Sequence, residues 1–134
     1  MVEKIFPAQD TALPHVLAFV EAELEKVACP MKAVMQITVC MEEMFINIAH
    51  YAYVDSSGEM KLEISADNQK VTLTLTDDGI AFDPLAKVDP DITLDADKRE
   101  IGGLGIFMVK KTMDEVAYER KNGKNIFIMS KQLR

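Results

Sequence analysis

The feature that most constrains the fold is an apolar stripe at helical spacing between residues 31 and 53. Its members predict one face of a long amphipathic helix: Val34, Ile37, Met41, Phe45, Ile48 and Ala52. Val39 and Cys40 extend the apolar character to a second side of this helix, which also carries Glu43 and Asn47. A helix that is apolar on more than one side is usually covered on more than one side. We therefore expect one face to pack on a sheet and the other to meet a ligand.

The rest of the chain predicts the sheet that this helix covers. Alternating apolar residues predict a hairpin with strands at 60–66 and 71–77 and a turn at Asp67-Asn68. Further strands are expected at 5–6, 116–120 and 126–130, and further helices at 11–28 and 103–113. The expected fold class is α/β in the α+β sense, a two-layer sandwich with helices on one face of a mixed, mainly antiparallel sheet.

The composition narrows the setting of this fold. The 134 residues, 49% of them hydrophobic, fit a single domain over residues 1–134. A formal net charge of −7 argues against direct nucleic-acid binding and against binding to an anionic membrane. No run approaches the ~20 apolar residues that span a bilayer, and Cys29 and Cys40 form neither a metal-binding spacing nor a disulfide framework. We expect a cytoplasmic protein with two reduced, buried thiols.

Three polar side chains stand out against the apolar pattern: Glu43, Asn47 and Asp77. Glu43 and Asn47 are one helical turn apart, so both can converge on one metal-bound phosphate group. Asp77 ends a strand whose alternate residues are apolar, so its carboxylate is expected to point toward the core. A buried carboxylate is costly unless a donor satisfies it, and the edge of a nucleotide base would be such a donor.

Two glycine-bearing segments complete this pattern. Gly102-Gly103-Leu104-Gly105 opens an apolar helix, where free backbone N–H groups and the positive end of the helix dipole favour phosphate. The missing side chains allow a close approach. Together with Asp77-Asp78-Gly79 and the two polar residues of the long helix, this segment predicts a nucleotide site.

Each of these features also has a simpler interpretation. Glu43 could be a solvated helix residue like Glu42, and Asp77-Asp78-Gly79 alone is more often an ordinary turn at the end of a strand. His50 is expected to be structural or solvated rather than catalytic. Four methionines at roughly helical spacing are expected to fill the core: Met31, Met35, Met41 and Met44.

In their order and spacing, these motifs resemble those of the GHKL ATPases. Residues 43–53 resemble the N box of that superfamily, 77–84 its first glycine box, and 102–105 its second. The resemblance extends from about Val34 to Lys131, and the nearest branch is the bacterial anti-sigma-factor serine/threonine kinases. It implies a Bergerat-type ATP-binding fold, the histidine-kinase-like ATPase domain, with ATP and Mg²⁺ as cofactors.

The resemblance also assigns roles to the site residues. Glu43 matches the general base that accepts a proton from an attacking hydroxyl, and Asn47 matches the asparagine that holds Mg²⁺. Asp77 matches the aspartate that accepts a hydrogen bond from the exocyclic amine of adenine, and residues 83–99 match the ATP lid. The other implied cofactor-binding positions are Gly79 and Ala81 in the first glycine box and Gly102, Gly103, Leu104 and Gly105 in the second.

By the same resemblance, we expect an ATP-dependent serine/threonine protein kinase that acts as an anti-sigma factor. Its partners would be a sigma factor and a small antagonist protein, and the sequence is compatible with a homodimer. Two alternatives stay open: an ATP-gated protein-binding module without kinase activity, and a free-standing GHKL-type ATPase domain.

The chain departs from the family pattern at two positions. Tyr51 stands where many members have histidine, and Asn125 stands where related ATPases often have threonine. We expect neither departure to touch the groups that bind the ligand.

Overall fold

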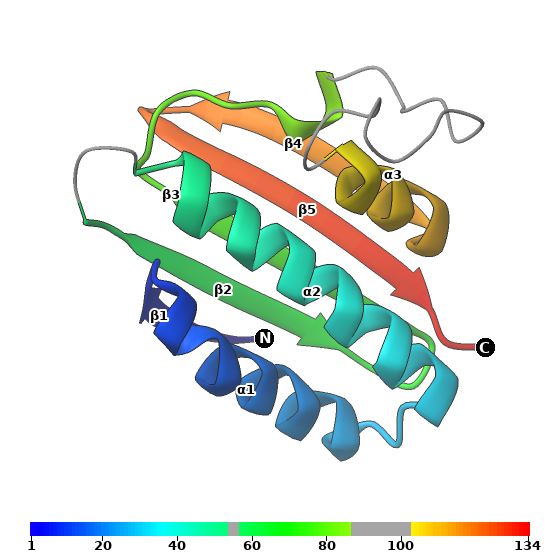
Figure 1. Cartoon of the computed structure of the whole chain (residues 1–134). Helices are drawn as coiled ribbons and strands as arrows, with labels where there is room; N and C mark the ends of the chain where they lie inside the picture. Colours follow the sequence, from blue (N-terminus) through cyan, green and yellow to red (C-terminus); the bar gives the residue numbers. More distant parts are fainter. Residues whose placement is uncertain (54–56, 87–102) are drawn as a thin grey trace.

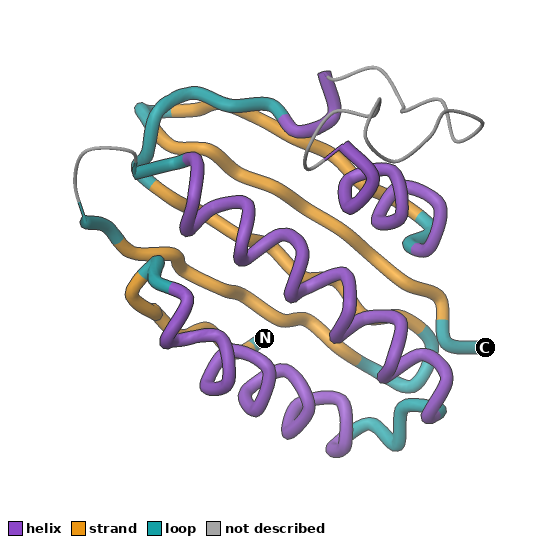
Figure 2. The backbone as a smooth tube through the Cα atoms, viewed as in Figure 1, coloured by secondary structure: helices purple, strands orange, loops and turns teal. Residues whose placement is uncertain are grey.

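A five-stranded sheet carries the helices on one of its faces in the computed structural model, which describes residues 1–53, 57–86 and 103–134 (Figure 1). The strands are β1 (Val2–Pro7), β2 (Glu59–Ala66), β3 (Lys70–Asp77), β4 (Glu115–Lys121) and β5 (Lys124–Gln132). The helices are α1 (Leu13–Lys26), α2 (Met31–Tyr51) and α3 (Gly103–Thr112), and short 3₁₀ turns form η1 (Asp10–Ala12) and η2 (Pro84–Ala86). Figure 2 shows the helices as one layer over the strands, so the expected two-layer sandwich is confirmed.

The strands follow the order β1-β2-β3-β5-β4 in the sheet. The four pairings of the described strands are all antiparallel, so the sheet is antiparallel there rather than mixed. Two of these pairings are hairpins, β2 with β3 and β4 with β5, and a tight hairpin can join only antiparallel strands. A further pairing places β5 beside β3, although α3 and β4 lie between these two strands in the chain.

Alternation along the strands directs apolar side chains toward the helix layer. Val71, Leu73 and Leu75 of β3 are fully buried, and Asp77 continues the same parity. The matching side chains of β2 and β5 are also buried: Met60, Leu62, Ile64, Phe127 and Met129. The core therefore lies between the sheet and the helices.

Helix α2 lies between α1 and α3 in the helix layer (Figure 1). Its residues Ile37, Met41 and Phe45 are fully buried, as the apolar stripe predicts. Cys40 is buried as well, beside Thr112 of α3. The second side of α2 is therefore covered in part by another helix.

The four methionines of α2 do not share one environment. Met41 and Met44 are buried, whereas Met31 and Met35 are 70% and 62% exposed. The expectation that all four fill the core is wrong for the first two, because they lie in the first turns of α2 on the side that faces solvent.

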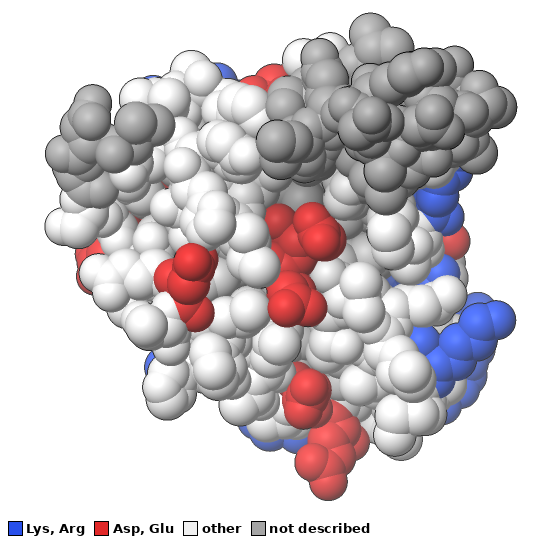
Figure 3. Space-filling view, in the orientation of Figure 1, with Lys and Arg blue, Asp and Glu red and all other residues white. Residues whose placement is uncertain are grey.

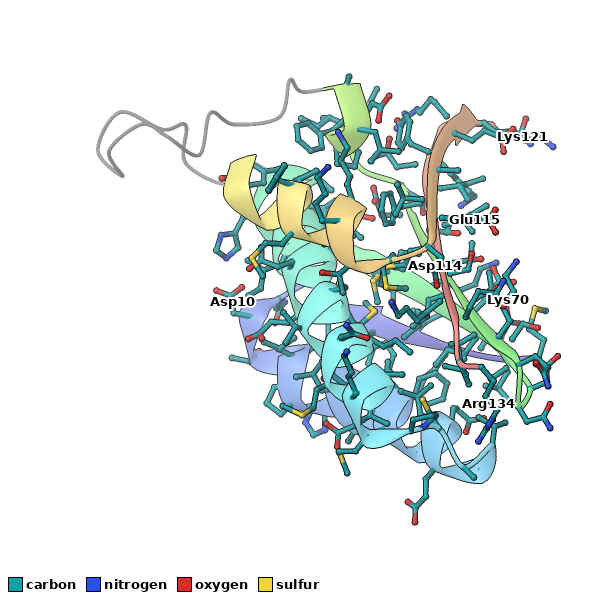
Figure 4. The ribbon with its side chains drawn as sticks, turned by 90° about the vertical axis from the view of Figure 1, so that its right-hand side faces the viewer. Asp10, Lys70, Asp114, Glu115, Lys121 and Arg134 are labelled. Atoms are coloured by element: carbon teal, nitrogen blue, oxygen red, sulfur yellow. The ribbon has the colours of Figure 1, made fainter. Side chains whose placement is uncertain are left out.

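The hairpin of β4 and β5 is anchored at its open end. The backbone N–H of Asp114 donates to the carbonyl oxygen of Ser130 at 2.9 Å, and Asp114 Oδ2 accepts from the N–H of Gln132 at 2.6 Å. Figure 4 shows Glu115 near Lys70 at this end of the sheet, where the two side chains form an ion pair at 3.3 Å. These contacts lie at the open end of the hairpin, and the ion pair also links β4 to β3.

The charge is unevenly distributed over the helix face. Figure 3 shows Asp and Glu side chains near the centre of this face and Lys and Arg side chains gathered at one side.

Within the described ranges, no helix is long and apolar enough to cross a membrane.

Candidate functional site

A pocket opens between the C-terminal half of α2 and the strands β3, β4 and β5. Its lining is mostly apolar and comes from Met44, Ile48, Ala52, Phe82, Pro84, Tyr118 and Phe127. The polar lining residues are Asn47, Asp77 and Asn125, so the structure brings Asn47 of α2 and Asp77 of β3 into one site. A mostly apolar cavity with a few converging polar groups is the usual form of a small-molecule site.

Asp77 is the buried acid of this pocket. Only 5% of its surface is exposed, which confirms the inward parity expected from the sequence. Its Oδ1 atom accepts hydrogen bonds from the N–H of Gly79 and from Nδ2 of Asn125, both at 2.9 Å. No described residue donates to Oδ2, and no fully buried polar atom of the described side chains lacks a partner, so Oδ2 keeps some exposed surface on a side chain that lines the pocket. It is an acceptor that a donor on a ligand can satisfy.

Gly79 packs directly on the end of α2. A Cβ atom at Gly79 would lie 2.3 Å from the backbone oxygen of Ala52 and 2.5 Å from its Cβ. Ile80 donates its N–H to the same Ala52 oxygen at 3.0 Å. Gly79 is therefore required because the chain after β3 passes too close to Ala52 to leave room for a side chain.

The first glycine box is held from both sides. Arg120 of β4 donates from Nη1 to the carbonyl oxygen of Gly79 at 2.8 Å. Lys124 of β5 donates from Nζ to Asp78 Oδ1 at 2.5 Å, and this hydrogen bond, with the charge of Asp78, raises the pKa of Lys124. From the other side, the hydroxyl of Tyr53 accepts the N–H of Asp78 at 2.8 Å, and burial raises the pKa of Tyr53. These contacts distinguish the segment from an ordinary free turn.

Among the three polar lining residues, Asn125 is the one that the sequence does not assign to the site. It is buried and pairs with Asp77 across β5 and β3. Nδ2 donates to Asp77 Oδ1 and to the carbonyl oxygen of Ile80, at 2.9 and 2.8 Å. Oδ1 accepts from the N–H of Phe82 at 3.3 Å and from the hydroxyl of Tyr118 at 2.5 Å. The expectation that this departure from the family pattern touches no ligand-binding group is therefore wrong.

Glu43 lies outside the pocket lining, one helical turn from Asn47, and meets the start of α3. A Cβ atom at Gly105 would lie 2.0 Å from Glu43 Oε2 and 2.7 Å from its Cδ. Gly105 is in the first turn of α3, where the positive end of the helix dipole favours an anion. The structure therefore brings Glu43 next to Gly105, the last residue of the second glycine box.

Cys40 lies on α2 close to Glu43 but is not exposed to the site. Burial raises the pKa of its thiol to about 11, against the opposing effects of a hydrogen bond from Thr112 and the charge of Lys131. The thiol is therefore protonated near neutral pH, where it is a poor nucleophile. Both Cys29 and Cys40 are free, and Cys29 is only partly buried.

Two residues at the end of α2 make structural contacts. The ring of Tyr51 stacks on that of Phe82, with centroids 6.0 Å apart and an interplanar angle of 20°. His50 Nε2 lies 2.8 Å from Asp10 Oδ1, which joins α2 to η1 and agrees with the structural role expected for this histidine.

The remaining expected cofactor-binding positions are described only in part. Gly103 opens α3 and Leu104 follows it. Gly102 and residues 87–99 of the expected lid lie outside the described residues. Ala81 is exposed and is not among the pocket-lining residues.

The donor set around Asn47 fits a cation that arrives with phosphates. In the part of the chain that the structure describes, no group of three or more His, Cys, Asp or Glu side chains could hold a metal ion. The amide oxygen of Asn47 is a hard ligand, and Mg²⁺ usually takes one or two protein ligands and fills its shell with phosphate oxygens and water. Asn47 therefore suits Mg²⁺ bound to a nucleotide.

The sequence model of the histidine kinase-like ATPase domain matches residues 6–131, a range that contains the pocket and both glycine boxes. The chain belongs to this family. The resemblance stated from the N box and the glycine boxes is therefore confirmed. This ATPase domain is also similar to kinases whose names state their activity.

One such relative is the serine/threonine-protein kinase BtrW of Bordetella bronchiseptica, which is 27% identical over 90 residues. That match covers 66% of this chain and 63% of the relative, so the chain spans less than two thirds of BtrW. The serine-protein kinase RsbW of Listeria monocytogenes is 26% identical over 107 residues, which are 76% of this chain and 68% of that protein.

Solved structures agree on the fold. The RsbU and RsbW domains of Rv1364c from Mycobacterium tuberculosis match with a TM-score of 0.64 and 13% identity, over 99% of this chain and 33% of that one. The Acinetobacter baumannii histidine kinase AdeS matches with a TM-score of 0.55 and 13% identity, over 100% of this chain and 68% of that one. At this identity, the likeness establishes the ATPase-domain fold alone.

Proposed function

We propose that this ATPase domain binds ATP·Mg²⁺ and transfers the γ-phosphoryl group to a serine or threonine hydroxyl of a protein substrate. The observation that carries the proposal is the meeting of Asp77 and Asn47 in one pocket, with Glu43 one helical turn before Asn47 on α2 and against Gly105. Asp77 and Asn47 in the pocket and Glu43 beside the start of α3 support the roles of an acid that reads the base, an amide that holds the metal and a proton acceptor.

Each of these residues has a role that its environment supports. Asp77 offers Oδ2 to the exocyclic amine of adenine, since Oδ1 is already occupied by Gly79 and Asn125. The apolar lining of the pocket receives the purine ring. Asn47 supplies an oxygen to Mg²⁺, and the backbone of the second glycine box receives phosphate at the N-terminus of α3.

The chemistry that follows is a phosphoryl transfer. When bound, ATP·Mg²⁺ supplies the phosphoryl group and offsets the negative charge that develops on it. Glu43 accepts the proton of the attacking hydroxyl as its oxygen forms the new P–O bond and ADP leaves. The proximity of this carboxylate to Gly105 supports the role, because the start of α3 is where we propose that the phosphates bind.

The substrate class rests on the relatives named as serine kinases and on the resemblance to anti-sigma-factor kinases. We propose that the protein acts in the cytoplasm, where it phosphorylates a small antagonist protein and binds a sigma factor in its alternative partnership. The acidic centre of the helix face suits a partner with a basic surface.

The test is to incubate the protein with Mg²⁺, radiolabelled ATP and candidate antagonist proteins, and to identify the labelled residue. Label on one serine or threonine of an antagonist, absent when Mg²⁺ is chelated, is the expected result. An antagonist that binds in an ATP-dependent manner but is never labelled would replace the kinase with an ATP-gated binding module. ATP hydrolysis without binding to any antagonist would favour a free-standing ATPase.

A further inference from the structure

Asn125 joins three parts of the pocket through four hydrogen bonds. Its two Nδ2 hydrogens go to Asp77 Oδ1 and to the carbonyl oxygen of Ile80. Its Oδ1 takes the N–H of Phe82 and the hydroxyl of Tyr118. A primary amide has two donor hydrogens and two acceptor lone pairs, so the hydrogen-bonding capacity of this side chain is fully used.

This arrangement determines which way the amide faces. If Oδ1 and Nδ2 were exchanged, the amide oxygen would face Asp77 Oδ1 and the Ile80 carbonyl oxygen, and three acceptors would meet without a hydrogen between them. The same exchange would direct amide hydrogens at the N–H of Phe82. Asn125 is therefore held in one orientation and has no free donor for a ligand.

The consequence for Asp77 is that its two oxygens have different functions. Oδ1 accepts from Asn125 and from the N–H of Gly79, which hold the plane of the carboxylate from two directions. Oδ2 accepts from no described residue and keeps some exposed surface on a side chain that lines the pocket, so the fixed carboxylate also fixes the position of this second acceptor.

We propose that Asn125 is a positioning residue for nucleotide recognition, which locks Asp77 so that Oδ2 selects a purine with a 6-amino group. The inference rests on the proposed function, because it concerns the base of the bound nucleotide. A base with a hydrogen-bond donor at position 6 satisfies Oδ2. A base with only a hydrogen atom at position 6 leaves Oδ2 without a partner, and a base with a carbonyl group there places a second acceptor against it. Tyr118 contributes by holding the Oδ1 side of the same amide.

The experiment measures the ratio of two dissociation constants by calorimetry, one for ATP and one for purine riboside triphosphate, which lacks the 6-amino group. Wild-type protein is expected to prefer ATP by roughly 10- to 100-fold, the range that one hydrogen bond to a charged group supports. In Asn125→Ala, the preference should fall below about 3-fold while the affinity for purine riboside triphosphate changes little. A merely structural role would weaken both ligands alike.

Two further variants make the result decisive. Ser130→Ala removes another buried polar side chain of β5, paired with Thr72 rather than Asp77, and should keep the full preference for ATP. Tyr118→Phe removes only the hydroxyl that binds Asn125 and should lower the preference partly, which provides a reading if Asn125→Ala fails to fold.

The outcomes separate this inference from the proposed function. Full ATP preference in Asn125→Ala or Tyr118→Phe, or equal losses for both nucleotides, would overturn the role of Asn125 while ATP binding stands. If wild-type protein binds ATP and purine riboside triphosphate equally well, the proposed selection of the 6-amino group by Oδ2 is overturned, but nucleotide binding is not. Wild-type protein that binds neither nucleotide would overturn the proposed function itself.

Discussion

Gly105 in the first turn of α3 lies against the carboxylate of Glu43 on α2, so closely that a Cβ atom would come within 2.0 Å of Oε2. Gly79 is equally crowded, but the atom it meets is the backbone oxygen of Ala52 at 2.3 Å. The difference matters because the end of a glutamate side chain can turn aside, whereas a helix-terminal carbonyl that accepts a hydrogen bond cannot.

The variant Gly105→Ala should therefore separate stability from activity. Alanine is favoured over glycine in a helix by up to about 1 kcal/mol, which offsets the displacement of Glu43, so the free energy of unfolding should change little. Phosphorylation should fall by at least about 10-fold, because a displacement of about 1 Å at a catalytic group can cost roughly 10²-fold. Urea unfolding and phosphorylation rates of the same preparation check both halves. Unchanged activity would mean that this contact does not position Glu43.

The variant Gly79→Ala should lose stability instead. The added methyl group must push the first glycine box away from Ala52, and overpacking of this kind typically costs about 1–3 kcal/mol. The measurement is the free energy of unfolding from urea titrations, with Gly105→Ala as the matched control. Equal stability of the two variants would contradict the contrast between a backbone and a side-chain neighbour.

The variant Glu43→Gln tests the proposed base. It retains size and ATP binding but removes the proton acceptor, so phosphorylation should fall by roughly 10²–10⁴-fold. Glu42→Gln is the control, since Glu42 is adjacent in the chain but points about 100° away on the helix. Phosphorylation assays on both variants decide the matter, and similar losses in both would indicate a general effect of acidity or fold.

The variant Asp77→Asn tests adenine recognition. Its amide oxygen can take the place of Oδ1 toward Gly79 and Asn125, so the fold should survive. Its amide nitrogen then takes the place of Oδ2 and faces the adenine amine donor to donor, which should weaken ATP binding by about 1–3 kcal/mol. Calorimetry with Asp78→Asn as the control checks this, because Asp78 is exposed and bonds to Lys124. Undiminished affinity in folded Asp77→Asn protein would remove Asp77 from the site.

The buried thiol of Cys40 should make the free energy of unfolding fall as the pH rises into the alkaline range. Its pKa is raised from 9.0 to about 11 in the folded state, so the unfolded chain loses its thiol proton first as the pH rises. The stabilisation is fully present below pH 9 and is lost between about pH 9 and 11. Relative to Cys40→Ala, the wild-type protein should lose roughly 1–3 kcal/mol over this window. Urea unfolding across the pH range measures it, and parallel curves for the two proteins would refute it.

Much of the fold could be predicted from local patterns. The stripe through Ile37, Met41 and Phe45 predicted α2, and alternation predicted the β2–β3 hairpin and the inward direction of Asp77. These patterns succeed because backbone geometry alone decides which side chains share a face of a helix or strand. The same reasoning failed for Met31 and Met35, because helical spacing does not show which turns of a helix are left without a covering neighbour.

The candidate site was predicted in its parts but not in its assembly. Residue type and order indicate Glu43, Asn47, Asp77 and the glycine boxes as site residues. Asn125 departs from the family pattern, and the expectation that this departure has no effect is wrong, because Asn125 shares the parity of the buried residues Phe127 and Met129. That parity was the available signal, since a buried amide must find hydrogen-bond partners.

The sequence by itself determined the helices and strands, the inward face of each, and the residue types that can hold a nucleotide. Only the tertiary structure decided that β5 lies beside β3, which sets Asn125 opposite Asp77, and that α3 packs on α2, which sets Gly105 against Glu43. The physical reason is that periodicity acts over a few neighbouring residues, whereas strand order and helix packing minimise the free energy of the whole chain.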